Sequence, residues 1–172
     1  YDLTLSVAEV GFYDALGTKI RGVIPLVGAR DRPLPNRARV VNRLTGIIQE
    51  HEILPGMIKE YITLTSKDVI PLGATRAVIS WNCQYQNMTA RIDGNRVVFE
   101  GQNYLLFVLP PATITDGTGK TYEPITYALQ GNELTLALDI TSINAMPLPI
   151  VIDPTVTTCL LYTSPSPRDR TR

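Results

Sequence analysis

Short runs of strand-forming residues, separated by turn residues, recur along almost the whole chain, and they limit its fold more than any other feature. The runs follow one another roughly every 8 to 12 residues, a spacing typical of a β-sandwich or barrel. Between Thr89–Ile92 and Arg96–Glu100 stands Asp93-Gly94, a strong hairpin signal because glycine tolerates positive φ. We therefore predict an all-β chain, an antiparallel β-sandwich or irregular barrel with long loops and little helix.

Apolar side chains alternate or run together in several of these segments. Leu134, Leu136 and Leu138 fall on one face of a strand-like run. Tyr104–Leu109 is continuously apolar, as in a strand that is buried on both faces. With 44% hydrophobic residues, the chain can bury a core. We predict that this core contains Ile79, Trp81, Leu105, Phe107, Leu134 and Leu136.

The chain divides into three regions by composition. Residues 1–35 form an N-terminal strand and loop region, and part of it could belong to a preceding unit. Residues 36–158 form the β-sandwich module. The prolines and charges of Arg30–Arg39 predict an exposed connection, and Arg39–Thr45 predicts loop or strand. Because Tyr1 begins inside strand-like sequence, we expect the start to be a cut.

Residues 159–172 are predicted to be a non-native, disordered tail. Cys159–Asp169 matches eleven consecutive codons of a translated transposase sequencing adapter, although composition alone also permits a natural Ser/Pro/Arg tail. The full chain has 16 basic and 16 acidic residues. Excluding the tail removes three basic residues, Arg168, Arg170 and Arg172, but only one acidic residue, Asp169, so the remainder is mildly acidic. Cys83 is then the remaining cysteine, which excludes an internal disulfide.

Charge and composition argue against several classes of partner. A mildly acidic chain has no basic signature of nucleic-acid binding. Arg30, Arg32, Arg37, Arg39 and Arg43 crowd one stretch, but Asp31 stands among them, so a solvated loop is favoured over a phosphate-binding arm. No apolar run approaches the roughly 18 residues of a membrane span. We expect no metal and no cofactor, because soft ligands are few.

Catalytic signals are weak. His51 is the one histidine, and no Gly-x-Ser-x-Gly motif accompanies it, so we expect a surface or half-buried strand histidine rather than the base of a triad or a partner of Cys83. Carboxylates could support a hydrolase only if two of them shared a cleft. The candidates lie in strand-like runs and are Glu50, Glu52, Glu60, Glu100, Glu123 and Asp139.

Thr118-Gly119-Lys120-Thr121 resembles the end of a phosphate-binding loop. That loop requires an earlier glycine, and Ile114 occupies the position. We predict instead a turn between strands, capped by Asp116.

Trp81 allows two interpretations. With Tyr85, Tyr104 and Tyr122 it could form a platform that stacks on sugars, and Trp81, Tyr85 and Tyr104 are then the candidate ligand-binding residues. The favoured alternative is that Trp81 fills the core, as large aromatic residues commonly do.

Several phrases resemble a β module of large exported proteins. Pro149-Ile-Val-Ile-Asp-Pro-Thr155 is similar to the "YPVxIDPT" phrase that ends this module in wall-associated and Rhs-type (YD-repeat) surface proteins and in proteins with DNRLRE domains. Pro55–Glu60 and Phe107–Pro111 resemble earlier phrases, whereas Pro147-Leu-Pro149 lacks the usual aromatic residue. The resemblance covers roughly Ile53–Val156.

The resemblance implies a non-catalytic structural, spacer or interaction domain of a secreted, cell-surface or virion-associated protein. Its partners would be neighbouring domains of the same polypeptide. A carbohydrate-binding module that contacts glycan or cell wall, and a carboxylate-based hydrolase, remain the alternatives. No functional residues are implied by the resemblance, so we expect no enzyme activity.

Overall fold

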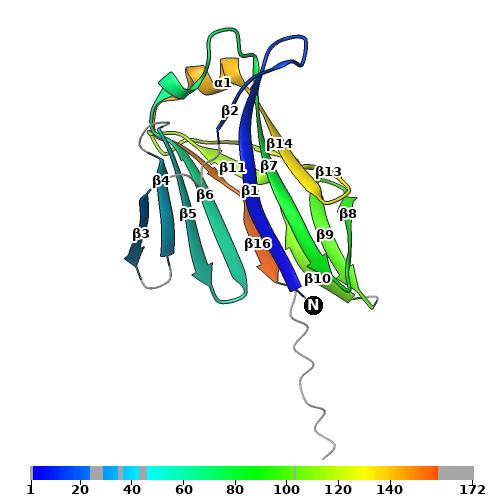
Figure 1. Cartoon of the computed structure of the whole chain (residues 1–172). Helices are drawn as coiled ribbons and strands as arrows, with labels where there is room; N and C mark the ends of the chain where they lie inside the picture. Colours follow the sequence, from blue (N-terminus) through cyan, green and yellow to red (C-terminus); the bar gives the residue numbers. More distant parts are fainter. Residues whose placement is uncertain (1, 24–28, 35–36, 43–45, 103, 159–172) are drawn as a thin grey trace, which may run out of the picture.

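Two antiparallel sheets make up the described part of the chain, which confirms the predicted all-β sandwich (Figure 1). The computed structural model describes residues 2–23, 29–34, 37–42, 46–102 and 104–158. The predicted tail, 159–172, lies outside these residues.

The smaller sheet has five strands in the order β13-β14-β7-β1-β2. Their bounds are β1 Asp2–Tyr13, β2 Lys19–Val23, β7 Arg76–Gln86, β13 Ala128–Gln130 and β14 Glu133–Asp139.

The larger sheet has 11 strands, and β6 is its central strand because it pairs with β5 on one side and with both β15 and β16 on the other. Its strands are β3 Ala29–Leu34, β4 Arg37–Asn42, β5 Ile47–Leu54, β6 Met57–Leu64, β8 Thr89–Asp93, β9 Arg96–Gly101, β10 Tyr104–Leu109, β11 Ala112–Thr115, β12 Thr121–Ile125, β15 Ile150–Asp153 and β16 Thr155–Thr158.

Prolines explain why the larger sheet divides beyond β6. Pro154 separates β15 from β16, and Pro110 and Pro111 separate β10 from β11. Proline has no N–H to donate, so each proline interrupts a ladder that would otherwise continue. As a result β15 pairs with β11, while β16 pairs with β10, and the two branches separate.

The N-terminal strand belongs to the sandwich. β1 lies between β7 and β2 and pairs with β7 from Asp2 opposite Gln86 to Tyr13 opposite Arg76. Strands on both sides of residue 35 therefore contribute to the same two-sheet structure.

The prediction that Arg30–Arg39 is a connection between strands is wrong, whereas its exposure stays a prediction. This stretch forms β3 and β4, a hairpin whose second strand pairs with β5. Pro33 is tolerated because β3 is an edge strand and its register shifts between Asp31 and Leu34.

Most of the predicted core is confirmed. Ile79, Trp81, Leu134 and Leu136 are at most 1% exposed. Leu105 and Phe107 are instead half-buried, as are Leu106 and Val108 on the other face of β10, and in this strand only Leu109 is fully buried, so the expected burial on both faces is only partial.

Among the residues that the structure describes, helix is confined to two short elements. The 3-10 helix η1 spans Lys67–Val69, and α1 spans Ile140–Ala145, where the Asp139 carboxylate caps the first turn by accepting the Ser142 N–H. None of the described helices has the length and apolarity that a bilayer crossing requires.

The described ends lie at the same end of the sandwich. β1 starts there and β16 finishes there, whereas α1 lies at the opposite end (Figure 1). Leu3 and Thr158 line one cavity, so the two terminal strands approach each other. We call this end the terminal pole and the α1 end the helical pole.

The turn between β11 and β12 confirms the prediction made for Asp116. Its carboxylate accepts hydrogen bonds from the backbone N–H groups of Thr118 and Lys120 and from the Tyr122 hydroxyl. No helix follows Thr121, because this residue begins β12, so the phosphate-loop alternative does not apply.

Gly117 in this turn cannot be replaced without moving the backbone. A Cβ there would lie 2.0 Å from the carbonyl oxygen of Leu148. Gly73, at φ +85°, has nothing within 4 Å of a built Cβ, so alanine there costs only the left-handed backbone penalty of about 1–2 kcal/mol.

We predict that Gly117→Ala lowers the free energy of unfolding by more than Gly73→Ala does, because the clash is with backbone rather than with a flexible side chain. Urea denaturation of the two variants measures the difference. Equal losses would contradict the predicted backbone contact.

Candidate functional site

A buried carboxylate lies between the two sheets. Glu60 is on β6 and only 9% exposed, and Gln49 on β5 is 1% exposed. A charged group in such a place needs hydrogen-bond partners, because burial removes its water.

Glu60 obtains these partners from both sheets. The indole Nε1–H of Trp81, on β7 of the smaller sheet, donates to Glu60 Oε2 at 2.6 Å. Within the larger sheet the Gln49 Nε2 donates to Oε1 at 2.5 Å. The Trp81–Glu60 bond therefore joins the two sheets across the core.

His51 completes the cluster. It lies directly opposite Glu60 in the β5–β6 ladder, and its Nε2 is 3.2 Å from Glu60 Oε1. Hydrogen bonding to Glu60 raises the pKa of the imidazole, while burial acts in the opposite direction. The predicted half-buried strand histidine is confirmed, since 37% of its side chain is exposed. We call Gln49, His51, Glu60 and Trp81 the inter-sheet polar cluster.

A cavity of about 100 Å³ adjoins this cluster on the side of the terminal pole. Glu60, His51 and Trp81 line it, and its other walls are mostly apolar. The apolar walls include Leu3, Leu5, Phe107, Leu109 and Val156. Several of these residues are only half-buried, so the cavity borders the surface.

Two buried polar atoms have no hydrogen-bond partner within the described part of the protein. They are Gln49 Oε1 and the Tyr127 hydroxyl. Tyr127 packs edge-on against Trp81, with ring centroids 6.0 Å apart. Burial, followed by the negative charges of Glu60 and Asp153, raises the pKa of this phenol, so Tyr127 stays neutral.

The sugar-stacking interpretation of Trp81 is wrong, and its predicted core role is confirmed. The ring is 1% exposed, and its N–H is used by Glu60. Tyr85 is half-buried and packs edge-on against Phe99 at 5.7 Å between centroids. Tyr104 is 58% exposed at the start of β10. The three candidate ligand-binding residues thus form no exposed platform.

Cys83 lacks the properties of a nucleophile. It is fully buried on β7, and burial raises the pKa of its thiol to about 11. Catalytic thiols need a lowered pKa and access to substrate, so the structure does not favour a Cys–His pair.

The other candidate acids are occupied by local contacts or stand at the surface. Glu52 accepts a hydrogen bond from the Tyr61 hydroxyl, and Glu50 also has a partner. Glu123 and Asp139 border one open groove, but Asp139 caps α1, and its hydrogen bonds with Ser142 lower its pKa. A glycosidase pair needs one acid with a raised pKa, so Asp139 is unsuited to that role.

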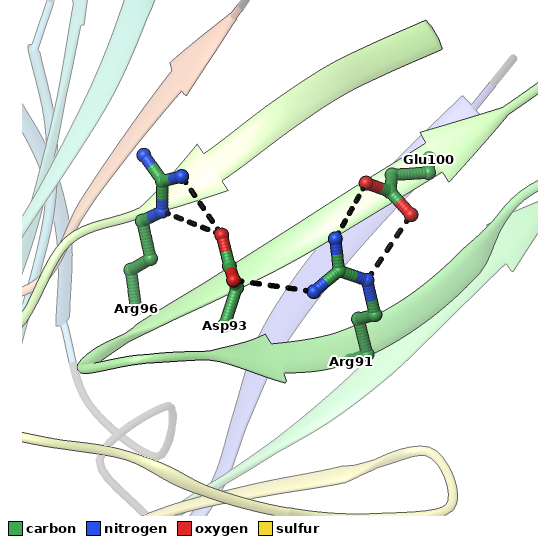
Figure 2. Close-up of polar contacts among 4 residues, drawn as sticks. All are labelled: Arg91, Asp93, Arg96 and Glu100. Atoms are coloured by element: carbon green, nitrogen blue, oxygen red, sulfur yellow. Dashed lines mark hydrogen bonds and ion pairs between the residues drawn. The ribbon is translucent and has the colours of Figure 1, made fainter. Parts of the chain in front are cut away.

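Glu100 belongs to a charged cluster on the β8–β9 hairpin (Figure 2). The Arg91 guanidinium lies between Glu100 and Asp93, at 2.9 and 3.3 Å, and Arg96 pairs with Asp93 at 2.8 Å. The two arginines lower the pKa of Asp93, with Arg96 contributing most. These four side chains satisfy one another on an exposed strand face, as cross-strand ion pairs commonly do.

No group of three or more metal-ligating side chains occurs among the described residues. The side chains of Arg30, Arg32, Arg37, Arg39 and Arg43 lie outside the described part, so the phosphate-arm alternative stays a prediction.

The inter-sheet polar cluster was missed by sequence reasoning. Glu60 was treated as one strand acid among several. Glu60 has the apolar Ile58 and Ile62 at the i±2 positions, which was the available signal that it shares a face with apolar side chains.

We predict that the stability provided by His51 decreases as pH rises. Because Glu60 raises the folded-state pKa, the native protein binds this proton more tightly than the unfolded chain does. The stabilisation is complete below the unfolded pKa of about 6.5 and is lost as pH rises through the higher folded value.

Thermal unfolding of the wild type and of His51→Gln between about pH 5 and pH 9 measures this effect. The melting temperatures should converge as pH increases. Parallel curves across that range would show that the imidazole and Glu60 are not paired.

Comparison with known protein families and with curated proteins finds no match to this chain.

Proposed function

We propose that this chain is a non-catalytic structural or interaction module of a large secreted, cell-surface or virion-associated protein. The observation that carries the proposal is that its polar clusters are directed inward or toward one another. Glu60 is held by Trp81 and Gln49, and Asp116 by its own turn. The Arg91 and Asp93 side chains pair with each other and with their neighbours on the hairpin. Such contacts stabilise a fold, which is the work of a structural module.

The positions of the terminal strands support a particular geometry for the module. Because both lie at the terminal pole, flanking sequence would enter and leave side by side, and the module would project from the polypeptide (Figure 1). The helical pole would then point away from the main chain and present its loops.

Two leucines at that far pole are consistent with presentation to a partner. Leu16 is 91% and Leu72 100% exposed, each at the tip of a turn. Their turns are neighbours, since the Thr75 N–H donates to the Tyr13 carbonyl. The partners that the sequence resemblance implies are neighbouring domains of the same polypeptide.

Fluorescence transfer tests this projecting geometry. We expect strong transfer between a donor and an acceptor protein fused to the two ends of residues 2–158. The control carries the acceptor inserted at Gly17, at the helical pole, and should show weaker transfer. Equal or stronger transfer in the control would contradict the proposal.

A turnover assay tests the absence of catalysis. Polysaccharide and peptide libraries incubated with the wild type should yield no more product than with Glu60→Gln, because Gln49 and Trp81 hold this carboxylate between the two sheets. Mass spectrometry measures product release. Turnover that disappears in Glu60→Gln would establish an enzyme and overturn the proposal.

A further inference from the structure

The cavity beside Glu60 has the size of a small ligand site. Protein interiors leave few voids larger than a water molecule. An engineered apolar cavity of about 150 Å³ stays dry and accepts benzene. The cavity here is about 100 Å³, which by the same scale accommodates about four non-hydrogen atoms.

Its lining is chemically asymmetric. Glu60, His51 and Trp81 contact one another and therefore lie together in one part of the lining, and the rest is largely hydrocarbon from residues such as Leu3, Leu5 and Val156. A ligand that matches these walls carries its polar group at one end and an apolar body at the other.

The charge of that polar group follows from Glu60. A carboxylate offers about four acceptor positions, and the Gln49, Trp81 and His51 nitrogens account for three. Gln49 and Trp81 are neutral donors that orient the carboxylate without balancing its charge, and His51 balances that charge only when its imidazole is protonated. The Glu60 carboxylate would repel an anion, and a neutral hydrocarbon would leave its fourth acceptor position without a hydrogen bond.

Aromatic rings strengthen the preference for a cation. Trp81 and Phe107 both line the cavity, so an ammonium group there would have aromatic rings in its surroundings. Sugars fit poorly because the walls offer few polar atoms.

We propose that this cavity binds a primary alkylammonium group, with the ammonium at Glu60 and the first three carbons of the alkyl chain along the apolar walls, so that a longer chain extends toward the surface that the cavity borders. This chemistry occurs in free alkylamines and in the lysine side chain. The inference stands apart from the structural role above, because a module with an empty cavity would still be a structural module.

Methyl NMR at pH 8 tests the site, with n-butylammonium as the probe and n-butanol as its uncharged match. We expect n-butylammonium to shift the Leu3, Leu5 and Val156 methyl resonances, and n-butanol to bind at least about tenfold more weakly, as a charged hydrogen bond requires. Equal affinities, or shifts confined to other residues, would overturn the proposal.

Two variants distinguish the contribution of the Glu60 charge to binding from that of the cavity volume. Glu60→Gln should weaken n-butylammonium at least about tenfold and leave n-butanol unchanged. Val156→Phe fills the cavity without altering a residue of the inter-sheet polar cluster, so it should abolish binding of both n-butylammonium and n-butanol. This variant keeps the test valid if Glu60→Gln fails to fold. Unchanged binding in Val156→Phe would overturn the proposal.

A further titration distinguishes the two sources of the ammonium. Nα-acetyl-lysine amide with an affinity similar to that of n-butylammonium would support a lysine side chain of a protein as the occupant. Binding of n-butylammonium alone would support a free amine. Binding of neither would overturn the proposal.

Discussion

The hydrogen bond from Trp81 to Glu60 is the constraint on which the rest of this structure depends. It links β7 of the smaller sheet to β6, the central strand of the larger sheet. Apolar packing between sheets is not directional. A buried carboxylate that must meet an indole N–H allows only one relative placement of its two strands.

The inter-sheet polar cluster also divides the interior of the sandwich into two parts. On the side of the helical pole, a small void of about 40 Å³ is lined by apolar side chains such as Phe12, Ile62 and Ile79. On the side of the terminal pole lies the larger cavity, with Glu60 and His51 on its wall. The same side chains that fix the sheets therefore also give this cavity its single charged wall.

Local sequence signals predicted much of the fold. The Asp93-Gly94 turn connects β8 and β9, with Gly94 at φ +62°, and the alternating leucines of β14 are buried as expected. These features depend on neighbours in the chain. The hairpin of β3 and β4 was missed because Pro33 and the surrounding charges read as a loop, whereas an edge strand accommodates both.

The candidate site was less predictable because it depends on contacts between distant strands. Glu60 and Trp81 are 21 residues apart, and nothing local indicates that one donates to the other. For Trp81 the sequence left two interpretations open, an exposed platform and a core residue. The larger sheet covers the face of β7 that carries Trp81, where the ring donates to Glu60 of β6, and this decides between them.

Hydrogen exchange at the indole N–H tests the central contact most directly. Trp81 is the only tryptophan in the chain, so its side-chain resonance is unambiguous. If its N–H is held by Glu60 between the sheets, exchange into heavy water should be slow and should require global unfolding. Exchange within seconds under native conditions would show that this hydrogen bond does not join the two sheets.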